Sequence, residues 1–194
     1  MDLKYKGFDG HELDITIPPC RCAVLPYFIS NTGKIYLVFG IDRNTGDITD
    51  WGGSVKPGET SAQAAGRELG EESCGIIIIN DDIIAQNPAV YNCYQLSNDD
   101  IINSRNSAIT FFCQMTKECA MNFPVTFAET NFRTNEMVDV KILSILETYR
   151  SLEQGAIYYL ICDNIAQALG HLSLLESKLI AQKERESIKA VIKK

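Results

Sequence analysis

Residues 53–76 read GSVKPGETSAQAAGRELGEESCGI, and this stretch carries six residues at the fixed spacing G-x5-E-x7-R-E-x-x-E-E. The six residues are Gly53, Glu59, Arg67, Glu68, Glu71 and Glu72. Because each residue type fills roughly 5–7% of protein positions, six fixed identities match by chance in such a chain with a probability on the order of 10⁻⁵. The spacing is therefore a specific signal.

A helix is predicted to follow the turn at Pro57 and Gly58. Thr60-x-x-Gln63 has the form of a capping box, so the helix should begin at about Ser61. One side of this helix is apolar and can dock on a sheet. Its apolar stripe consists of Ala62, Ala65 and Leu69.

Three carboxylates lie beside that stripe, because Glu68, Glu71 and Glu72 share an arc about 100° wide at roughly 100° per residue. Carboxylates so close raise one another's pKa values unless a cation neutralises them. Oxygen ligands suit Mg²⁺ or Mn²⁺, and Mg²⁺ commonly bridges carboxylates to substrate phosphates. Arg67, four residues before Glu71, can hold a carboxylate in place. The pattern predicts a metal site, and the alternative is a solvated helix face with one ion pair.

This segment resembles the Nudix box, and the chain resembles a Nudix hydrolase. The resemblance implies an α/β fold, namely the Nudix-type α/β/α sandwich with a mixed β-sheet and a helical C-terminal extension. It also implies hydrolysis of a nucleoside diphosphate linked to another moiety, by attack of water on a phosphorus of the pyrophosphate. The implied cofactor is Mg²⁺, with Mn²⁺ as the alternative.

The resemblance also assigns roles to residues by matching position. Metal ligands are expected at Gly52, through its carbonyl, and at Glu68, Glu71 and Glu72. Catalytic or supporting roles are expected for Glu68, Glu59, Arg67, Glu71 and Glu136. Glu136 represents the acidic group that the family often draws from a later loop, and it is preferred to Glu129 because it adjoins the apolar pair Met137-Val138.

The chain departs from the family pattern at the end of the helix. The family reads E-E-x-G-aliphatic, whereas Glu71-Glu72-Ser73-Cys74-Gly75-Ile76 has one residue more. We expect Gly75 to close the helix in a left-handed cap, so that the extra residue follows the last metal ligand.

The composition is that of a globular protein, with 194 residues, 45% hydrophobic and 22% charged. We expect a single Nudix hydrolase domain over residues 1–194, with a core at about 20–150 and C-terminal helices at about 154–194. The charged N-terminal segment does not read as a signal peptide, and no run reads as a membrane span. Seven cysteines without a CxxC pair predict free thiols. These features predict a cytoplasmic protein.

Hydrophobic patterns predict a succession of strands joined by turns. The predicted strands are residues 22–30, 34–41, 48–51, 76–79, 89–96, 107–115 and 137–146, the last ending in a passage to helix. From about Gln154 the pattern is helical, and Gly170 predicts a break or a kink, so that at least two helices are expected. Within the box helix, Gly66 and Gly70 predict close approach of another element. Trp51 is expected to fill the core rather than stack on a base.

The net charge of −7 argues against a broad nucleic-acid surface, so a small nucleotide or dinucleotide is the expected partner. A Tyr about eighteen residues after the box marks family members that act on dinucleoside polyphosphates, and Tyr94 has this spacing from Ile76. Two alternatives are an RNA 5′-end or cap pyrophosphohydrolase and a catalytically silent nucleotide sensor. A homodimer is left open. The RNA alternative would use a basic C-terminal helix with Lys178, Lys183, Arg185, Lys189, Lys193 and Lys194.

Overall fold

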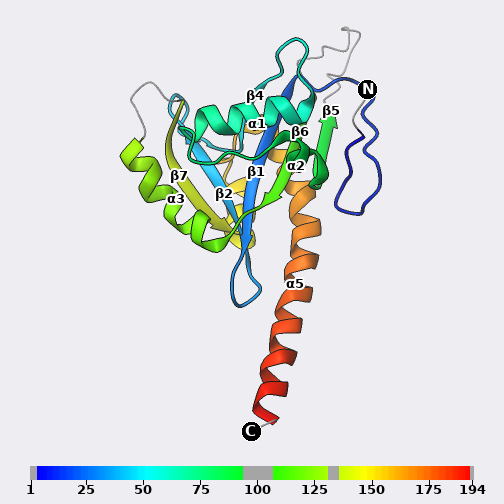
Figure 1. Ribbon diagram of the computed structural model, residues 1–194, viewed down its shortest axis with the longest axis vertical. Coiled ribbons are helices and arrows are strands. Elements are labelled where there is room, and N and C mark those ends of the chain that lie inside the picture. The colour runs from blue at the N-terminus through cyan, green and yellow to red at the C-terminus, as the bar shows by residue number, and fades with distance from the viewer. Residues whose placement is uncertain (1–3, 94–106, 131–135, 193–194) are drawn as a thin grey trace.

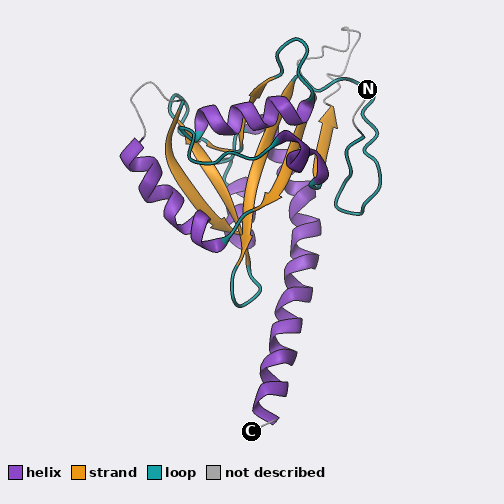
Figure 2. Ribbon diagram, viewed as in Figure 1, coloured by secondary structure: helices purple, strands orange, loops and turns teal. Residues whose placement is uncertain are grey.

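The computed structural model describes residues 4–93, 107–130 and 136–192, which form a mixed seven-stranded sheet with helices on both faces (Figures 1 and 2). The strands are β1 (Arg21–Ile29), β2 (Ile35–Asp42), β3 (Ile48–Thr49), β4 (Trp51–Ser54), β5 (Ala89–Cys93), β6 (Ser107–Gln114) and β7 (Met137–Ser144). The helices are α1 (Ser61–Glu72), α2 (Asp81–Gln86), α3 (Lys117–Thr130), α4 (Ile145–Glu153), the 3₁₀ helix η2 (Tyr159–Ile161) and α5 (Cys162–Ile192). The predicted α/β sandwich is confirmed.

Strand β1 is the centre of the sheet. The main path is β3-β2-β1-β6-β5, with β4 paired to β1 and β7 paired to β2. The pairing of β1 with β6 is parallel, and the other pairings are antiparallel. The N-terminal half of β1 pairs with β4, which places Cys22 opposite Gly53 and Ala23 opposite Gly52. The two glycines are thereby fixed beside the middle of the sheet.

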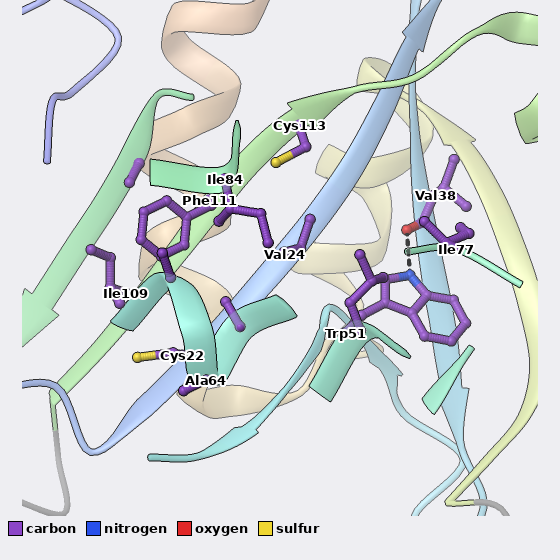
Figure 3. Close-up of a cluster of buried hydrophobic side chains, with 14 of the residues drawn as sticks. Cys22, Val24, Val38, Trp51, Ala64, Ile77, Ile84, Ile109, Phe111 and Cys113 are labelled. Carbon is purple, nitrogen blue, oxygen red and sulfur yellow. Dashed lines mark hydrogen bonds between the residues drawn. The ribbon is translucent and has the colours of Figure 1, made fainter. Parts of the chain in front are cut away.

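Alternation along β1 divides the core into two layers, as expected for a strand covered on both sides. Cys22 and Val24 face the layer beneath α1, α2 and α3, whereas Leu25 and Tyr27 face the layer beneath α4 and α5. Figure 3 shows part of the first layer, in which the side chain of Ile84 lies near Phe111 and Val24, and Ala64 of α1 lies near Cys22. Helix α1 is thus anchored by its apolar side.

Trp51 lies fully buried in the first layer, as expected. Its indole Nε1 donates a hydrogen bond to the carbonyl oxygen of Val38 at 2.9 Å (Figure 3). Phe123 and Phe127 of α3 pack against its ring. The sequence analysis did not predict α3, although Ala120, Phe123 and Phe127 are spaced as the buried stripe of a helix.

The predicted strand at residues 76–79 is wrong. This segment belongs to no strand, and the Ser73 hydroxyl holds it by accepting a hydrogen bond from the Ile77 N–H at 3.1 Å and donating one to the Ile77 carbonyl at 3.2 Å. Ile77 is buried, whereas Ile78 is 80% exposed. A short run of β-branched residues after a helix can therefore be held by hydrogen bonds from a nearby side chain without forming a strand.

The predicted break at Gly170 is also wrong, because α5 is a single helix of 31 residues that continues through Gly170. Ile165, Leu169 and Leu172 bury one stripe of α5 against the sheet, and this packing outweighs the roughly 1 kcal/mol helix penalty of glycine. The last part of α5 extends away from the sheet (Figure 1). Helical structure begins earlier than the predicted Gln154, since α4 starts at Ile145. Across the described residues, no helix combines the length and the apolar character that crossing a membrane would require.

We predict that Trp51→Phe lowers the free energy of unfolding by about 2–3 kcal/mol, because it leaves the buried Val38 carbonyl without its donor and opens space beside α3. Urea denaturation measures the change. Tyr159→Phe is the control, since Tyr159 is 71% exposed and its replacement should alter stability by less than about 0.5 kcal/mol. Equal stabilities of the two variants would contradict this account of the core.

Candidate active site

Helix α1 begins where the capping box predicts. Thr60 Oγ1 accepts a hydrogen bond from the Gln63 N–H at 3.2 Å, and Gln63 Oε1 accepts one from the Thr60 N–H at 2.9 Å. The two bonds satisfy donors that the first helical turn leaves open. They fix the residue at which the helix begins, and the burial of Ala62, Ala65 and Leu69 decides which side of the helix faces the sheet.

The extra residue at the end of α1 is accommodated by two successive left-handed residues. Cys74, with φ 57°, is the left-handed residue that follows the C-cap Ser73, so the prediction that Gly75 forms this cap is wrong by one residue; Gly75, with φ 74°, comes next. The Gly75 N–H donates to the Gly70 carbonyl at 2.8 Å. The insertion therefore lies after Glu72 and leaves the register of the carboxylates unchanged.

Arg67 is the central donor of a hydrogen-bond network on the polar side of α1. Its guanidinium donates to Glu59 Oε1 at 2.6 Å, Glu59 Oε2 at 3.0 Å, Glu68 Oε1 at 2.6 Å, Glu71 Oε2 at 3.2 Å and the Ser54 carbonyl at 3.0 Å. These five bonds use all the donors that an arginine side chain has. Arg67 thereby joins β4, the loop after it and the helix.

Glu59 is held as an ionised carboxylate. The bidentate hydrogen bond from Arg67, followed by the N–H of Lys56, lowers the pKa of Glu59 to about 2. A carboxylate with such a pKa is a weak proton acceptor near neutral pH, where an efficient general base has a pKa close to the working pH. Glu59 is therefore suited to supporting Arg67 rather than to activating water.

Glu68 lies against the backbone of β4. A Cβ atom on Gly53 would be 2.6 Å from Cδ of Glu68 and 2.7 Å from both of its carboxylate oxygens, too close for any side chain. Gly52 is more tightly constrained, because a Cβ there would overlap Ala23 and the backbone of β1, which cannot move aside as the end of a side chain can. The two glycines together allow a helix carboxylate to approach a strand that is itself packed against its neighbour.

Glu72 is the buried carboxylate of the set, with 5% of its surface exposed. Burial raises the pKa of Glu72 well above its ordinary value; Arg21 opposes this shift, and the carboxylates of Asp50, Glu68 and Glu136 add to it. A cation near Glu72 would relieve both the burial and the repulsion.

A cavity of about 250 Å³ opens beside Glu72 and the backbone of Gly52. Glu136 lines the same cavity, whereas Glu129 lies near the end of α3 and does not line it. The complete lining is Arg21, Asp42, Asn44, Thr45, Thr49, Gly52, Glu72, Glu136, Met137 and Tyr158. The cavity thus joins two segments of the predicted site that are far apart in sequence.

Glu71 lies outside this cavity. Its side chain is 56% exposed and pairs with Arg67 and, at 3.8 Å, with Nζ of Lys56. Among residues 4–93, 107–130 and 136–192, no three His, Cys, Asp or Glu side chains are close enough to form a metal-binding group. Helical spacing places the glutamates on one side of α1, but Arg67 draws Glu68 and Glu71 towards itself.

The residues nevertheless fit a hard divalent cation in their chemistry. Carboxylate and carbonyl oxygens are the preferred ligands of Mg²⁺. The Gly52 carbonyl and Glu72 line the cavity, and Glu68 occupies the space that Gly53 leaves open.

The sequence analysis missed Arg21 and Asp50. Arg21 Nη2 donates to the Gly52 carbonyl at 2.9 Å and lies 2.7 Å from Oδ1 of the buried Asp50. Each is a charged residue beside an apolar run at the end of a strand. Solvent-exposed charged residues commonly occupy the same kind of position, so the pattern alone does not identify a site residue. The adjacency of Asp50 to Trp51-Gly52-Gly53 was the only available signal.

The two glycines inside α1 differ. At Gly66 a Cβ would lie 3.1 Å from Cδ1 of Ile84 in α2, as the predicted close approach requires. At Gly70 a Cβ would meet nothing within 4 Å, so the same prediction is wrong there.

We predict that Gly53→Ala lowers the free energy of unfolding by about 1–3 kcal/mol, because the methyl group displaces Glu68 from its charge-assisted bond with Arg67. Gly70→Ala is the matched control, and it should raise stability by about 0.5–1 kcal/mol, since helical Gly70 has free space around it. Urea unfolding compares the two. Stabilisation by both substitutions would show that Gly53 is not needed for the seating of Glu68.

No protein-family model matches the sequence, and no curated protein matches it. Solved structures do resemble the fold. The C. elegans Ap4A hydrolase binary complex has a TM-score of 0.50 and 16% identity, over 79% of this chain and 96% of that chain. Another structure of C. elegans Ap4A hydrolase has a TM-score of 0.47 and 17% identity, over 84% and 99%.

The Nudix hydrolase RenU from M. smegmatis has a TM-score of 0.49 and 9% identity, over 85% of this chain and 92% of that chain. Tyr94, the expected marker for dinucleoside polyphosphates, lies outside the described residues. At these identities the likeness concerns architecture. The mixed sheet, its covering helices and the similarity to the C. elegans enzyme show that the chain has the Nudix-type α/β/α fold.

Proposed function

We propose that this protein is a Mg²⁺-dependent Nudix pyrophosphohydrolase, in which residues 1–194 form one domain and residues 53–76 are the Nudix box. Its substrate is a nucleoside diphosphate linked to another moiety. The observation that carries the proposal is the position of the Glu68 carboxylate, which lies against Gly53 and accepts a hydrogen bond from Arg67. Buried Glu72 and Gly52 adjoin it. A solvated helix face requires neither the glycine pair nor a buried carboxylate.

In this proposal the Gly52 carbonyl, Glu68, Glu71 and Glu72 hold the metal. When bound, Mg²⁺ neutralises phosphate charge and increases the acidity of a coordinated water. Glu71 must leave its exposed position to take part, and its single bond to Arg67 at 3.2 Å is the longest that the guanidinium makes to a carboxylate.

The reaction adds water to one phosphorus of the pyrophosphate and breaks that phosphorus's bond to the bridging oxygen. One of the three helix carboxylates accepts the proton of the attacking water, and the bridging oxygen leaves with the other phosphate. Arg67 and Glu59 keep the carboxylates in position. Glu136, which lines the same cavity, would orient water or an additional cation.

A dinucleoside polyphosphate is the first substrate to test, because the similar C. elegans structures are of an Ap4A hydrolase and Tyr94 has the expected spacing. An RNA 5′ end is the second candidate. It is favoured by the side chains of Lys178, Arg185 and Lys189, which share one face of α5. Glu186 lies on the same face, which weakens the attraction of that face for a phosphate chain.

The test is a panel of free nucleotides, dinucleoside polyphosphates and triphosphorylated RNA incubated with Mg²⁺, with the products separated by charge. We predict that Glu68→Gln lowers turnover of the best substrate on the order of 10²- to 10⁴-fold without changing the fold. Glu118→Gln, at the exposed start of α3, is the control and should retain full activity.

Near-normal turnover by Glu68→Gln at saturating Mg²⁺ would remove Glu68 from the metal site. Absence of Mg²⁺-dependent cleavage across the panel, despite nucleotide binding, would favour the silent sensor instead. Preferential cleavage of RNA would transfer the assignment to the second candidate.

A further inference from the structure

A second arginine, Arg21, is half-buried and lines the cavity. Arg21 begins β1, pairs with Ser54 of β4 and has a side chain that is only 13% exposed. Its Nη2 is engaged by Asp50 and the Gly52 carbonyl. Its Nη1 is buried and has no hydrogen-bond partner in the part of the chain that the structure describes. A buried donor without a partner is costly, so it requires an explanation.

The carboxylate behind Arg21 is itself held from across the sheet. Asp50 Oδ2 accepts a hydrogen bond from Thr110 Oγ1 at 2.9 Å, and Thr110 Oγ1 accepts one from Asn164 Nδ2 at 3.2 Å. Asp50, Thr110 and Asn164 are all fully buried. This relay connects the start of β4 through β6 to α5, and each hydrogen bond in it points towards the aspartate.

Fold stability alone does not account for this arrangement. A buried ion pair is often no more stabilising than apolar residues of similar volume, because desolvation offsets the attraction. Here the pair adjoins a cavity, and Arg21 is the single cationic residue among the described residues that line it. The other charged residues of the lining, Asp42, Glu72 and Glu136, are anionic.

We propose that Arg21 binds a phosphate oxygen of the substrate and that Asp50, Thr110 and Asn164 are positioning residues that aim its guanidinium. This inference rests on the proposed function, since it assigns the site a phosphate-bearing ligand. The N–H groups of Nη1 are the donors left for a phosphate oxygen, because Nη2 is engaged by Asp50 and the Gly52 carbonyl. The charge of an arginine does not depend on pH in the physiological range. With a metal neutralising the carboxylates, Arg21 supplies the directional contact.

The test measures binding without turnover. The probe is α,β-methylene ADP, whose bridging carbon prevents hydrolysis, titrated into the full chain with Mg²⁺ in a calorimeter. Arg21→Lys keeps the charge but loses the guanidinium, and we expect it to weaken binding roughly 10- to 100-fold. Thr110→Val removes only the relay hydroxyl, and we expect binding to weaken about three- to tenfold.

Thr148→Val is the matched control, because Thr148 is also fully buried and its hydroxyl makes one hydrogen bond, to the Ser144 carbonyl in α4. It should bind like the wild type whatever its melting temperature. With a hydrolysed substrate, Thr110→Val should raise KM and leave kcat within about threefold, a separation that general destabilisation does not produce.

The outcomes distinguish this inference from the proposed function. Arg21-dependent binding of the probe, without hydrolysis of any nucleotide, would sustain the phosphate site and reject the enzyme. Wild-type affinity in Thr110→Val and Arg21→Lys, in an active enzyme, would overturn the inference and leave the function standing. Failure of the wild type to bind the probe at millimolar concentration would also overturn it. If Arg21→Lys does not fold, Thr110→Val decides.

Discussion

The candidate site depends on the hydrogen bonds that the Arg67 guanidinium donates to three carboxylates. The guanidinium gathers Glu59, Glu68 and Glu71 around one positive charge and ties them to the Ser54 carbonyl of β4. Without that charge, neighbouring carboxylates on one helix side would repel one another. The capping box at Thr60 sets the start of α1, and the burial of its apolar side against the sheet leaves Arg67 at the strand.

The glycine pair separates two arginine-centred networks. Arg67 holds Glu68 against Gly53, and Arg21 donates to the Gly52 carbonyl and pairs with Asp50. Neither Gly52 nor Gly53 has room for a Cβ atom, so the strand presents bare backbone to both networks. Two guanidiniums and a buried Glu72 give a site with charges of both signs, suited to a ligand that combines metal and phosphate.

Local signals predicted the parts of the fold that local interactions determine. The start of α1, its N-terminal cap and the burial of Trp51 follow from short-range patterns that few alternatives share. The continuity of α5 through Gly170 did not follow, because packing of Leu169 and Leu172 on the sheet outweighs a residue preference. Arg21 and Asp50 escaped notice because their partners come from β4, β6 and α5, which only the tertiary fold brings together. Glu71 shares the helical arc of the other glutamates but is turned outward by its contacts with Arg67 and Lys56.

The central claim is that β4 and α1 create one divalent-cation site between three residues, the Gly52 carbonyl, Glu68 and Glu72, which Glu71 joins when the ion is bound. Crystals grown with Mn²⁺ test it most directly, since anomalous scattering locates the ion without reference to activity. The account predicts an anomalous peak within about 2.0–2.4 Å of oxygens from all three residues, with Arg67 still bound to Glu59. A peak elsewhere, or none at millimolar Mn²⁺ in a crystal whose site is open to solvent, would contradict it.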